Sequence, residues 1–159
     1  MSFELKSILD EVSWRILIEL QNDARLSYSE LGRRLNMSAP AVAERVRRLE
    51  EDGIITGYHI AVDPFKLGAT MMVSIRMTTS GGNYDRLTET IQHMDEILEC
   101  HRLTGSDCFI MKAVVSSIGH LEDLIKRLIP FGSVNTSVVL SSPVKHRTIT
   151  GPISDPRIT

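Results

Sequence analysis

Hydrophobic residues at helical spacing occupy the first part of the chain. Apolar positions over residues 10–21 recur every three or four residues, which predicts a first amphipathic helix with an aspartate suited to cap its start. Ser27 and Glu30 match a capping box, in which each side chain accepts a hydrogen bond from the other residue's backbone N–H. A second, short helix is therefore expected to begin near Tyr28 and to end near Asn36.

A third helix is predicted almost immediately after the second. Ser38 is a good N-cap, and Pro40 is tolerated in the first turn because the amides there have no intrahelical partner. Gly53 can end the helix in a left-handed conformation. The apolar positions at i, i+4 and i+7 are Val42, Val46 and Leu49. Two helices joined by so short a turn, after a supporting helix, are typical of a helix-turn-helix motif.

After the third helix, the sequence becomes rich in β-branched and aromatic residues. Residues 54–68 are interpreted as an extended strand that connects two domains, closed by Asp63-Pro64. Strand-like and helical periods then alternate, with Gly81-Gly82 as a break after the first strand. The expected strands are 70–79, 97–103, 108–115 and 134–142, and the expected helices follow the caps Asn83 and Ser117.

The order β-α-β-β-α-β indicates a ferredoxin-like arrangement. The fold class is therefore α+β, with an N-terminal helix-turn-helix (winged-helix-like) domain and a C-terminal ferredoxin-like domain. The expected boundaries are 1–53 for the first domain, 54–68 for the linker, 69–142 for the second domain and 143–159 for an irregular tail.

Composition places the chain among globular proteins of the cytoplasm. Its 159 residues are 42% hydrophobic and 24% charged, and no apolar run approaches the ~20 residues of a membrane helix. The start lacks the pattern of a secretory signal. Two cysteines cannot form a disulfide scaffold, so reduced thiols are expected. The histidines are scattered, and we expect no metal and no cofactor.

Positive charge is concentrated in the helix-turn-helix segment. The formal net charge of the whole chain is −2, but five arginines and one acid between Arg33 and Arg48 give this stretch a charge of +4. With the apolar stripe of the third helix facing the core, small residues and arginines point outward. Small side chains let a helix backbone come close to the major groove, and arginine binds guanine or phosphate.

This pattern predicts contacts with double-stranded DNA. Glu44 can accept a hydrogen bond from a cytosine amine, whereas Arg45 lies near the core flank and is also suited to a charge pair that holds the helices together. The alternative is that these charges form an ordinary solvated face. The candidate DNA-binding residues are Arg33, Arg34, Ser38, Pro40, Ala43, Glu44, Arg45, Arg47 and Arg48.

Several local motifs occur together in the order of a known family. They include Ala24-Arg25-Leu26-Ser27, Leu35-Asn36-Met37-Ser38, Arg45-Val46-Arg47-Arg48-Leu49-Glu50, Gly53-Ile54-Ile55 and Thr104-Gly105 between two strands. From Leu9 to about Ser142, the chain resembles the leucine-responsive regulatory protein and AsnC (Lrp/AsnC) family. This resemblance implies a prokaryotic transcription regulator with a DNA-binding head and a ferredoxin-like effector domain.

The resemblance also implies a homodimer that assembles into an octamer, with a small-molecule effector, such as an amino acid, bound where dimers meet. The effector site would lie near the turn after the second strand of the effector domain. The candidate effector-binding residues are Thr104, Gly105, Ser106, Asp107, Cys108 and Thr136.

The chain departs from the family pattern at Cys108. The family commonly has an aspartate there, three positions after Gly105, where a carboxylate receives the ammonium of a ligand. Asp107 is one position early, which along a strand is the opposite face. Cys108 is interpreted as a small buried hydrophobe, with a redox sensor as the alternative.

Three functions remain open at this point. The first is a ligand-modulated, sequence-specific transcription regulator, and the second is an architectural protein that wraps or bends DNA without an effector. The third is a small-molecule-binding or enzymatic ferredoxin-like domain with a helical appendage for protein contacts. The sequence has no nucleophile elbow, P-loop or dinucleotide fingerprint, so we expect no enzyme.

Overall fold

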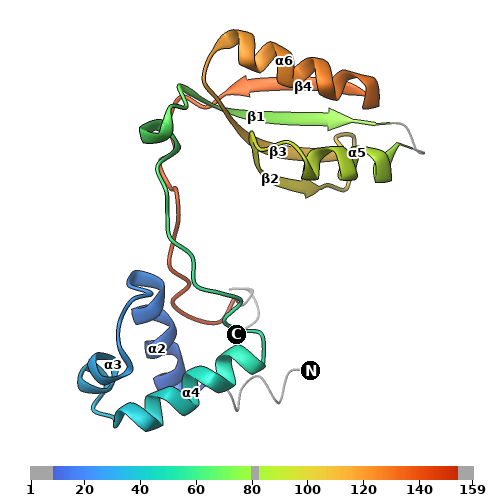
Figure 1. Cartoon of the computed structure of the whole chain (residues 1–159). Helices are drawn as coiled ribbons and strands as arrows, with labels where there is room; N and C mark the ends of the chain where they lie inside the picture. Colours follow the sequence, from blue (N-terminus) through green and yellow to red (C-terminus); the bar gives the residue numbers. More distant parts are fainter. Residues whose placement is uncertain (1–8, 80–82, 154–159) are drawn as a thin grey trace. The chain divides into compact units, whose positions relative to one another are not determined.

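The computed structural model describes residues 9–79 and 83–153, and these residues form two compact units. We call the first unit the head; it contains residues 9–61 together with 144–153. The second, which we call the effector unit, contains the described residues of 62–143. Figure 1 labels the helices and strands of both units.

The head contains the three predicted helices. They are α2 (Glu11–Asn22), α3 (Tyr28–Leu35) and α4 (Ala39–Glu51). Each begins at the expected cap: Asp10 Oδ1, Ser27 Oγ and Ser38 Oγ accept hydrogen bonds from the backbone N–H three residues on, at 2.8, 3.2 and 3.3 Å. The helix boundaries predicted from capping residues are therefore confirmed.

The turn between α3 and α4 is held by local conformation. Asn36 takes the left-handed conformation that ends α3, with φ 56°. Gly53 does the same directly after Asp52, the C-cap of α4, with φ 68°, and so ends that helix in the expected left-handed conformation. The buried core of the head is Ile16, Leu17, Leu20, Leu31, Leu35, Val42, Val46 and Leu49.

The capping box at the start of α3 forms only in half. Ser27 caps the helix as expected, but the Glu30 carboxylate does not return to the Ser27 backbone. It binds the guanidinium groups of Arg33 and Arg34 at 2.7–2.9 Å instead. Two charged donors outcompete one neutral amide for the same carboxylate.

The connector differs from the expected strand over residues 54–68. Residues 54–63 carry no strand, because no other segment of the described chain supplies a backbone ladder to them. Pro64–Leu67 forms a short 3-10 helix, η1, since Asp63 Oδ1 accepts from the Phe65 N–H at 3.0 Å and proline fixes the first φ. The expected single strand is therefore wrong.

The effector unit has the predicted ferredoxin-like order. Its elements are β1 (Met71–Thr78), α5 (Tyr84–Gln92), β2 (Ile97–Arg102), β3 (Phe109–Val115), α6 (Ile118–Leu128), η2 (Ile129–Phe131) and β4 (Ser133–Val138). The four strands form one antiparallel sheet in the order β2-β3-β1-β4. The two central strands are thus the two that alternate most regularly between buried and accessible residues.

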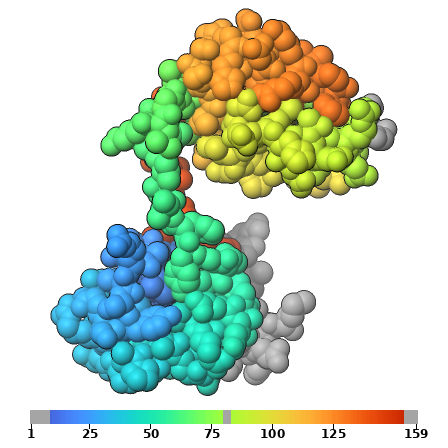
Figure 2. All heavy atoms as spheres, in the orientation of Figure 1, coloured from blue at the N-terminus to red at the C-terminus, as the bar shows by residue number. Residues whose placement is uncertain are grey.

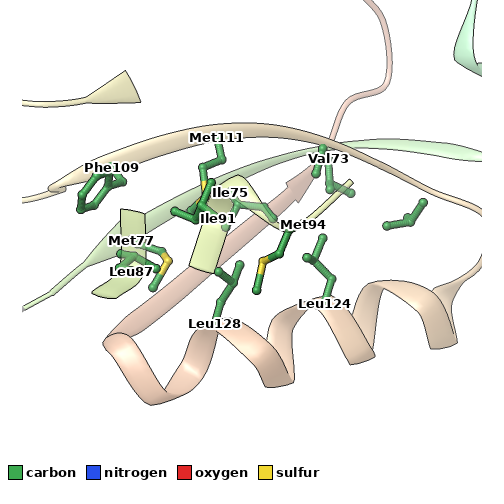
Figure 3. Packing of buried hydrophobic residues seen from close by; sticks show 12 residues of the cluster. Val73, Ile75, Met77, Leu87, Ile91, Met94, Phe109, Met111, Leu124 and Leu128 are labelled. Carbon is green, nitrogen blue, oxygen red and sulfur yellow. The ribbon is translucent and has the colours of Figure 1, made fainter. Parts of the chain in front are cut away.

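The core of the effector unit lies between one face of the sheet and the two helices. Figure 3 shows Leu124 and Leu128 of α6 directed at the sheet, which contributes Ile75 and Met111, with Ile91 of α5 in the same core. No helix of the described residues lies over the other sheet face. Its residues alternate with the buried ones along β1 and β3, so its central part is only half-buried in this single chain.

Three details of the effector unit differ from expectation or fall outside it. Asn83 occupies the N-cap position of α5, but its side chain makes no capping hydrogen bond, because its backbone is already helical. The last strand ends at Val138, because its pairing with β1 stops there, and does not extend to Ser142 as expected. Gly81-Gly82 lies outside the described residues.

The tail is irregular over residues 143–153, as expected, but it is not free. The side-chain amide of Gln21 at the end of α2 donates to the Ile149 carbonyl at 3.0 Å and accepts from the Ile149 N–H at 2.9 Å. Thr148 Oγ1 also donates to Asn22 Oδ1 at 3.3 Å. One glutamine thus pairs with both the backbone N–H and the backbone carbonyl of Ile149 and joins the tail to the head.

Candidate DNA-binding face and effector turn

The third helix presents the expected two sides. Val42, Val46 and Leu49 are at most 1% exposed and fix one side against the core of the head. The opposite side, which we call the α4 face, consists of Pro40, Ala43, Glu44, Arg47 and Arg48. Pro40, Arg47 and Arg48 are exposed, and Ala43 and Glu44 are half-buried. Figure 2 shows atoms of α3 and α4 on the surface of the head.

One carboxylate connects both arginines of the α4 face. Glu44 accepts hydrogen bonds from Arg47 at 2.8 and 2.9 Å and from Arg48 at 2.9 Å. Arg47 also pairs with Glu51. The hydrogen bonds from Arg47 and then Arg48 lower the pKa of Glu44 to about 2, so this carboxylate stays ionised at every physiological pH.

The same arrangement occurs on α3. Glu30 accepts from Arg33 at 2.7 and 2.9 Å and from Arg34 at 2.8 Å, and these two arginines lower the pKa of Glu30 to about 2. Arg34 pairs in addition with Glu19 of α2 at 2.5 Å. The guanidinium groups of α3 are therefore held next to acids before any DNA arrives.

Arg45 holds α4 against the start of α2. Its guanidinium donates to Asp10 at 2.7 and 2.8 Å and to Ser13 Oγ at 3.2 Å. Partial burial raises the pKa of Asp10, but the hydrogen bonds from Ser13 and Arg45 outweigh it and leave the pKa lowered. The charge pair expected for Arg45 is confirmed, and this residue belongs to the support of the motif.

The charge of +4 counted along the sequence is therefore compensated in space. Each of the five arginines between Arg33 and Arg48 contacts at least one carboxylate. A count over consecutive residues missed this because four of the five acids lie outside the counted stretch. The partners are Asp10, Glu19, Glu30, Glu44 and Glu51.

The candidate effector turn joins β2 to β3. Thr104 and Ser106 are exposed and Asp107 is half-buried. The turn is anchored to the neighbouring central strand, since Thr78 Oγ1 donates to the Ser106 carbonyl at 3.2 Å and the Cys108 N–H donates to the Met77 carbonyl at 2.7 Å. The hydroxyls of the turn thus face solvent on a fixed backbone.

Cys108 is half-buried and packs against the core of the effector unit, as expected of a small hydrophobe, but its thiol also has polar neighbours. The Tyr84 hydroxyl donates to its Sγ at 3.3 Å, and this hydrogen bond lowers the pKa of the thiol. The Arg102 guanidinium lies 4.5 Å from the centre of the Tyr84 ring, within cation–π range. The first residue of α5 therefore reaches the turn, which periodicity alone did not indicate.

Thr136 lies apart from the turn within one chain. It is half-buried on β4, opposite Ile75 of β1. Because the sheet order is β2-β3-β1-β4, the strand of Thr136 and the hairpin that carries the turn lie on opposite sides of β1.

A polar network at the start of β2 was missed by sequence reasoning. His120 Nε2 contacts Glu96 Oε1 at 3.0 Å, and Ser116 Oγ contacts His120 Nδ1 at 3.0 Å. Arg127 also pairs with Glu96. Burial by itself raises the pKa of Glu96. The hydrogen bonds from His120, the backbone and Arg127 lower it by more, so the pKa is about 2. The one sequence signal was the i, i+4 spacing of Ser116 and His120.

Among the described residues, no helix combines the length and the apolar character that a membrane span requires. No three histidine, cysteine or acidic side chains among them converge as a metal-ion site would need.

Family models match both units in the order found in the chain. A model of a winged helix-turn-helix DNA-binding domain matches residues 9–56, and a model of the Lrp/AsnC ligand binding domain matches residues 70–149. The two models together cover the helix-turn-helix motif and the whole sheet.

Curated relatives match over most of their length. The HTH-type transcriptional regulator LrpC of Bacillus subtilis is 38% identical over 133 residues, which are 84% of this chain and 92% of that protein. The leucine-responsive regulatory protein of Escherichia coli is 34% identical over 120 residues, 74% of this chain and 73% of that protein.

Solved structures agree in fold. The structure of B. subtilis LrpC has a TM-score of 0.83 at 36% identity and covers 87% of this chain and 99% of its own. The structure of E. coli AsnC has a TM-score of 0.80 at 30% identity, with 90% and 99% covered. The resemblance inferred from the motifs is thus confirmed: the protein is a DNA-binding transcriptional regulator with a ligand-binding domain, not an enzyme, and it belongs to the Lrp/AsnC family.

Proposed function

We propose that the chain reads its operator with the α4 face. The observation that carries this proposal is the division of α4 into a stripe that is at most 1% exposed and an opposite side of small residues followed by arginines. Pro40 and Ala43, near the start of the helix, allow close approach to the groove, and Arg47 and Arg48 reach base edges or phosphates.

The neighbouring turn supplies phosphate contacts. Ser38 Oγ already accepts from the Ala41 N–H at 3.3 Å, but its hydroxyl proton remains available to a phosphate oxygen. Arg33 is 74% exposed at its side chain and lies on α3 beside Arg34. Arg45 is left out of the interface, because its contacts with Asp10 and Ser13 fix the position of α4.

The test is fluorescence-anisotropy binding to the DNA upstream of the protein's own gene and to a scrambled fragment, over a salt series. Arg47→Ala and Arg48→Ala should each weaken operator binding by about tenfold to a hundredfold, since one lost base contact costs about 1–3 kcal/mol. Arg86→Ala, which removes an exposed arginine of α5, is the matched control and should bind as wild type.

The outcomes separate the remaining alternatives. Preference for the upstream fragment that persists as salt rises supports sequence-specific regulation. Equal, strongly salt-dependent binding to both fragments supports an architectural role in wrapping or bending DNA. Arginine variants that bind both fragments like wild type would show that another surface carries the DNA.

The effector unit is proposed to bind an amino acid at the β2–β3 turn. The supporting observations are the match to a ligand-binding domain over residues 70–149 and the exposed hydroxyls of Thr104 and Ser106, which suit a ligand carboxylate. The E. coli relative is named for its response to leucine. Position 108 is a cysteine in this chain, so we propose that the carboxylate of Asp107, within the turn, receives the ammonium of the ligand.

Assembly is proposed to complete the site. In the part of the chain that the structure describes, one face of the sheet has no helix over it, which suits a homodimer formed through the sheets, and an octamer would then be a tetramer of such dimers. Because the turn and Thr136 lie apart within one chain, residues from a second chain would be needed to bring the two parts of the site together. We place this regulator and its DNA in the cytoplasm.

A further inference from the structure

The two helices of the helix-turn-helix motif share one charge pattern. Glu30 is followed by arginines three and four positions later, and Glu44 is followed by arginines at the same two distances. Both segments therefore read E-x-x-R-R, once on the supporting helix and once on the helix that carries the proposed DNA contacts. On a helix, positions i, i+3 and i+4 are neighbours, so one carboxylate can hold two guanidinium groups.

In the structure, the glutamate of each pattern pairs with both of its arginines. Every arginine of the two patterns lies 2.7–2.9 Å from the glutamate of its own pattern. The arginine side chains are 40–74% exposed, so solvent and phosphate can reach them. Each glutamate thus acts as an internal counter-ion on the surface that is proposed to meet DNA.

An internal counter-ion reduces the free energy that an arginine contributes to DNA binding. An arginine that is free in solution gains a phosphate contact and releases the counter-ions of the DNA, which makes it attractive to DNA of any sequence. An arginine held by a carboxylate must first give up that ion pair, or share it, and the freed carboxylate then lies in the negative field of the backbone. Non-specific contacts therefore gain less from these arginines than their charge suggests.

We infer that Glu30 and Glu44 determine specificity by holding the arginines of the motif and so weakening binding to DNA that offers phosphates alone. On an operator, base contacts made by α4 offset the loss of the internal pairs, whereas non-specific DNA offers no such contacts. This inference rests on the proposed α4 face and adds to it a role for acids on a nucleic-acid-binding surface.

The test replaces the charge and keeps the shape. Glu30→Gln and Glu44→Gln should each raise affinity for the scrambled fragment by on the order of fivefold, since each removes two exposed ion pairs. The dependence of log affinity on log salt should become steeper, by about 0.9 for each arginine that newly takes a phosphate. The ratio of operator to scrambled affinity should fall in both variants. Circular dichroism at matched temperature shows whether each variant is folded.

Glu50→Gln is the matched control. Glu50 lies on the same helix and loses the same charge, but it accepts a hydrogen bond from the Tyr58 hydroxyl at 2.8 Å rather than from an arginine. If Glu50→Gln raises non-specific affinity as much as Glu44→Gln does, the effect is one of net charge and the inference is overturned. Unchanged affinity of Glu30→Gln and Glu44→Gln for the scrambled fragment overturns it as well.

Failure of the inference is distinguishable from failure of the proposed function. If the DNA face is misassigned, Arg47→Ala and Arg48→Ala bind the operator like wild type. If only the inference is wrong, those arginine variants still lose operator binding, while the two glutamate variants behave like Glu50→Gln.

Discussion

At the scale of single residues, the turn of the helix-turn-helix motif depends on one missing side chain. A Cβ added at Gly32 would lie 2.5 Å from the Met37 carbonyl oxygen, closer than real Cβ atoms approach a backbone oxygen. Gly32 is otherwise an ordinary helical residue of α3, and its N–H and C=O serve the helix and the turn; its carbonyl accepts from the Met37 N–H at 2.8 Å. The glycine therefore allows α3 and the turn to come into contact.

We expect Gly32→Ala to destabilise the head by about 1–3 kcal/mol, as overpacking against a backbone group does. Urea unfolding followed by the fluorescence of Trp14, the one tryptophan of the chain, reports this unit. Ser29→Ala places alanine at an exposed position of the same helix and should be nearly neutral. A Gly32→Ala head as stable as wild type would mean that the turn moves away without cost.

The Glu96 carboxylate is a second residue with a local and measurable effect. Its pKa in the folded chain is about 2, below the usual glutamate value of 4.5, because His120 and Arg127 bind its ionised form despite partial burial. A lowered carboxyl pKa stabilises the fold at pH values above about 4.5, and this contribution is lost as the pH falls from there toward 2.

Acid should therefore weaken the wild-type effector unit more than the Glu96→Gln variant. Between pH 5 and pH 3 we expect the variant to lose roughly 1–2 kcal/mol less unfolding free energy than wild type, measured by circular dichroism in urea. Asp95→Asn, at the exposed neighbouring position, is the control and should follow wild type. Parallel pH profiles for Glu96→Gln and wild type would contradict the network.

At the scale of elements, the contact between α2 and the tail is the least expected. The tail has prolines and no periodicity, so nothing in its own sequence predicts docking. Gln21 nevertheless pairs with both the backbone N–H and the backbone carbonyl of Ile149, and it also donates to the Leu17 carbonyl at 3.1 Å. A side-chain amide here takes the place of a neighbouring strand.

Removing this amide should release the tail. Gln21→Ala loses two hydrogen bonds to the tail, each worth about 0.5–1.5 kcal/mol, so trypsin should cut after Lys145 and Arg147 several times faster than in wild type. Mass spectrometry of the released peptides measures the rate. Gln92→Ala, at the exposed end of α5, is the matched control. Equal cleavage rates in Gln21→Ala and wild type would show that the contact does not protect the tail.

At the scale of the whole molecule, the chain leaves the head once and returns to it. Residues 9–61 belong to the head, the described residues of 62–143 form the effector unit, and residues 144–153 belong to the head again. Two covalent connections therefore link the effector unit to the DNA-binding helices. A ligand changes DNA binding only to the extent that it prefers one state of the assembly over another.

An amino-acid effector should be visible as a change in both stability and assembly. In a panel of amino acids, we expect one to raise the unfolding free energy, by about 2.7 kcal/mol at a hundredfold excess over its Kd, and to shift the sedimentation velocity profile. Cys108→Asp, which restores the carboxylate common in the family, should tighten binding by about tenfold, with Cys108→Ser as the neutral control. If no amino acid changes either property, the architectural alternative gains support.

Local chemistry made the elements predictable from the sequence. The three N-caps of the head, the left-handed Asn36 and the apolar stripes specified α2, α3 and α4 nearly to the residue, because those signals act within one helical turn. Alternation and turn length likewise specified the order of strands and helices in the effector unit, and local motifs were sufficient to indicate the family and its function.

Tertiary structure decided what depends on residues far apart in the chain. It brought Glu19 and Asp10 to arginines that appeared unpaired in the sequence, Tyr84 to Cys108, and Gln21 to the tail. It also left residues 54–63 without a ladder, although their β-branched side chains favour a strand. The physical reason is the same in each case. Helix caps and hydrophobic periodicity depend on residues close together in the sequence, whereas long-range ion pairs and backbone ladders need a partner that only the folded chain, or a second chain, can supply.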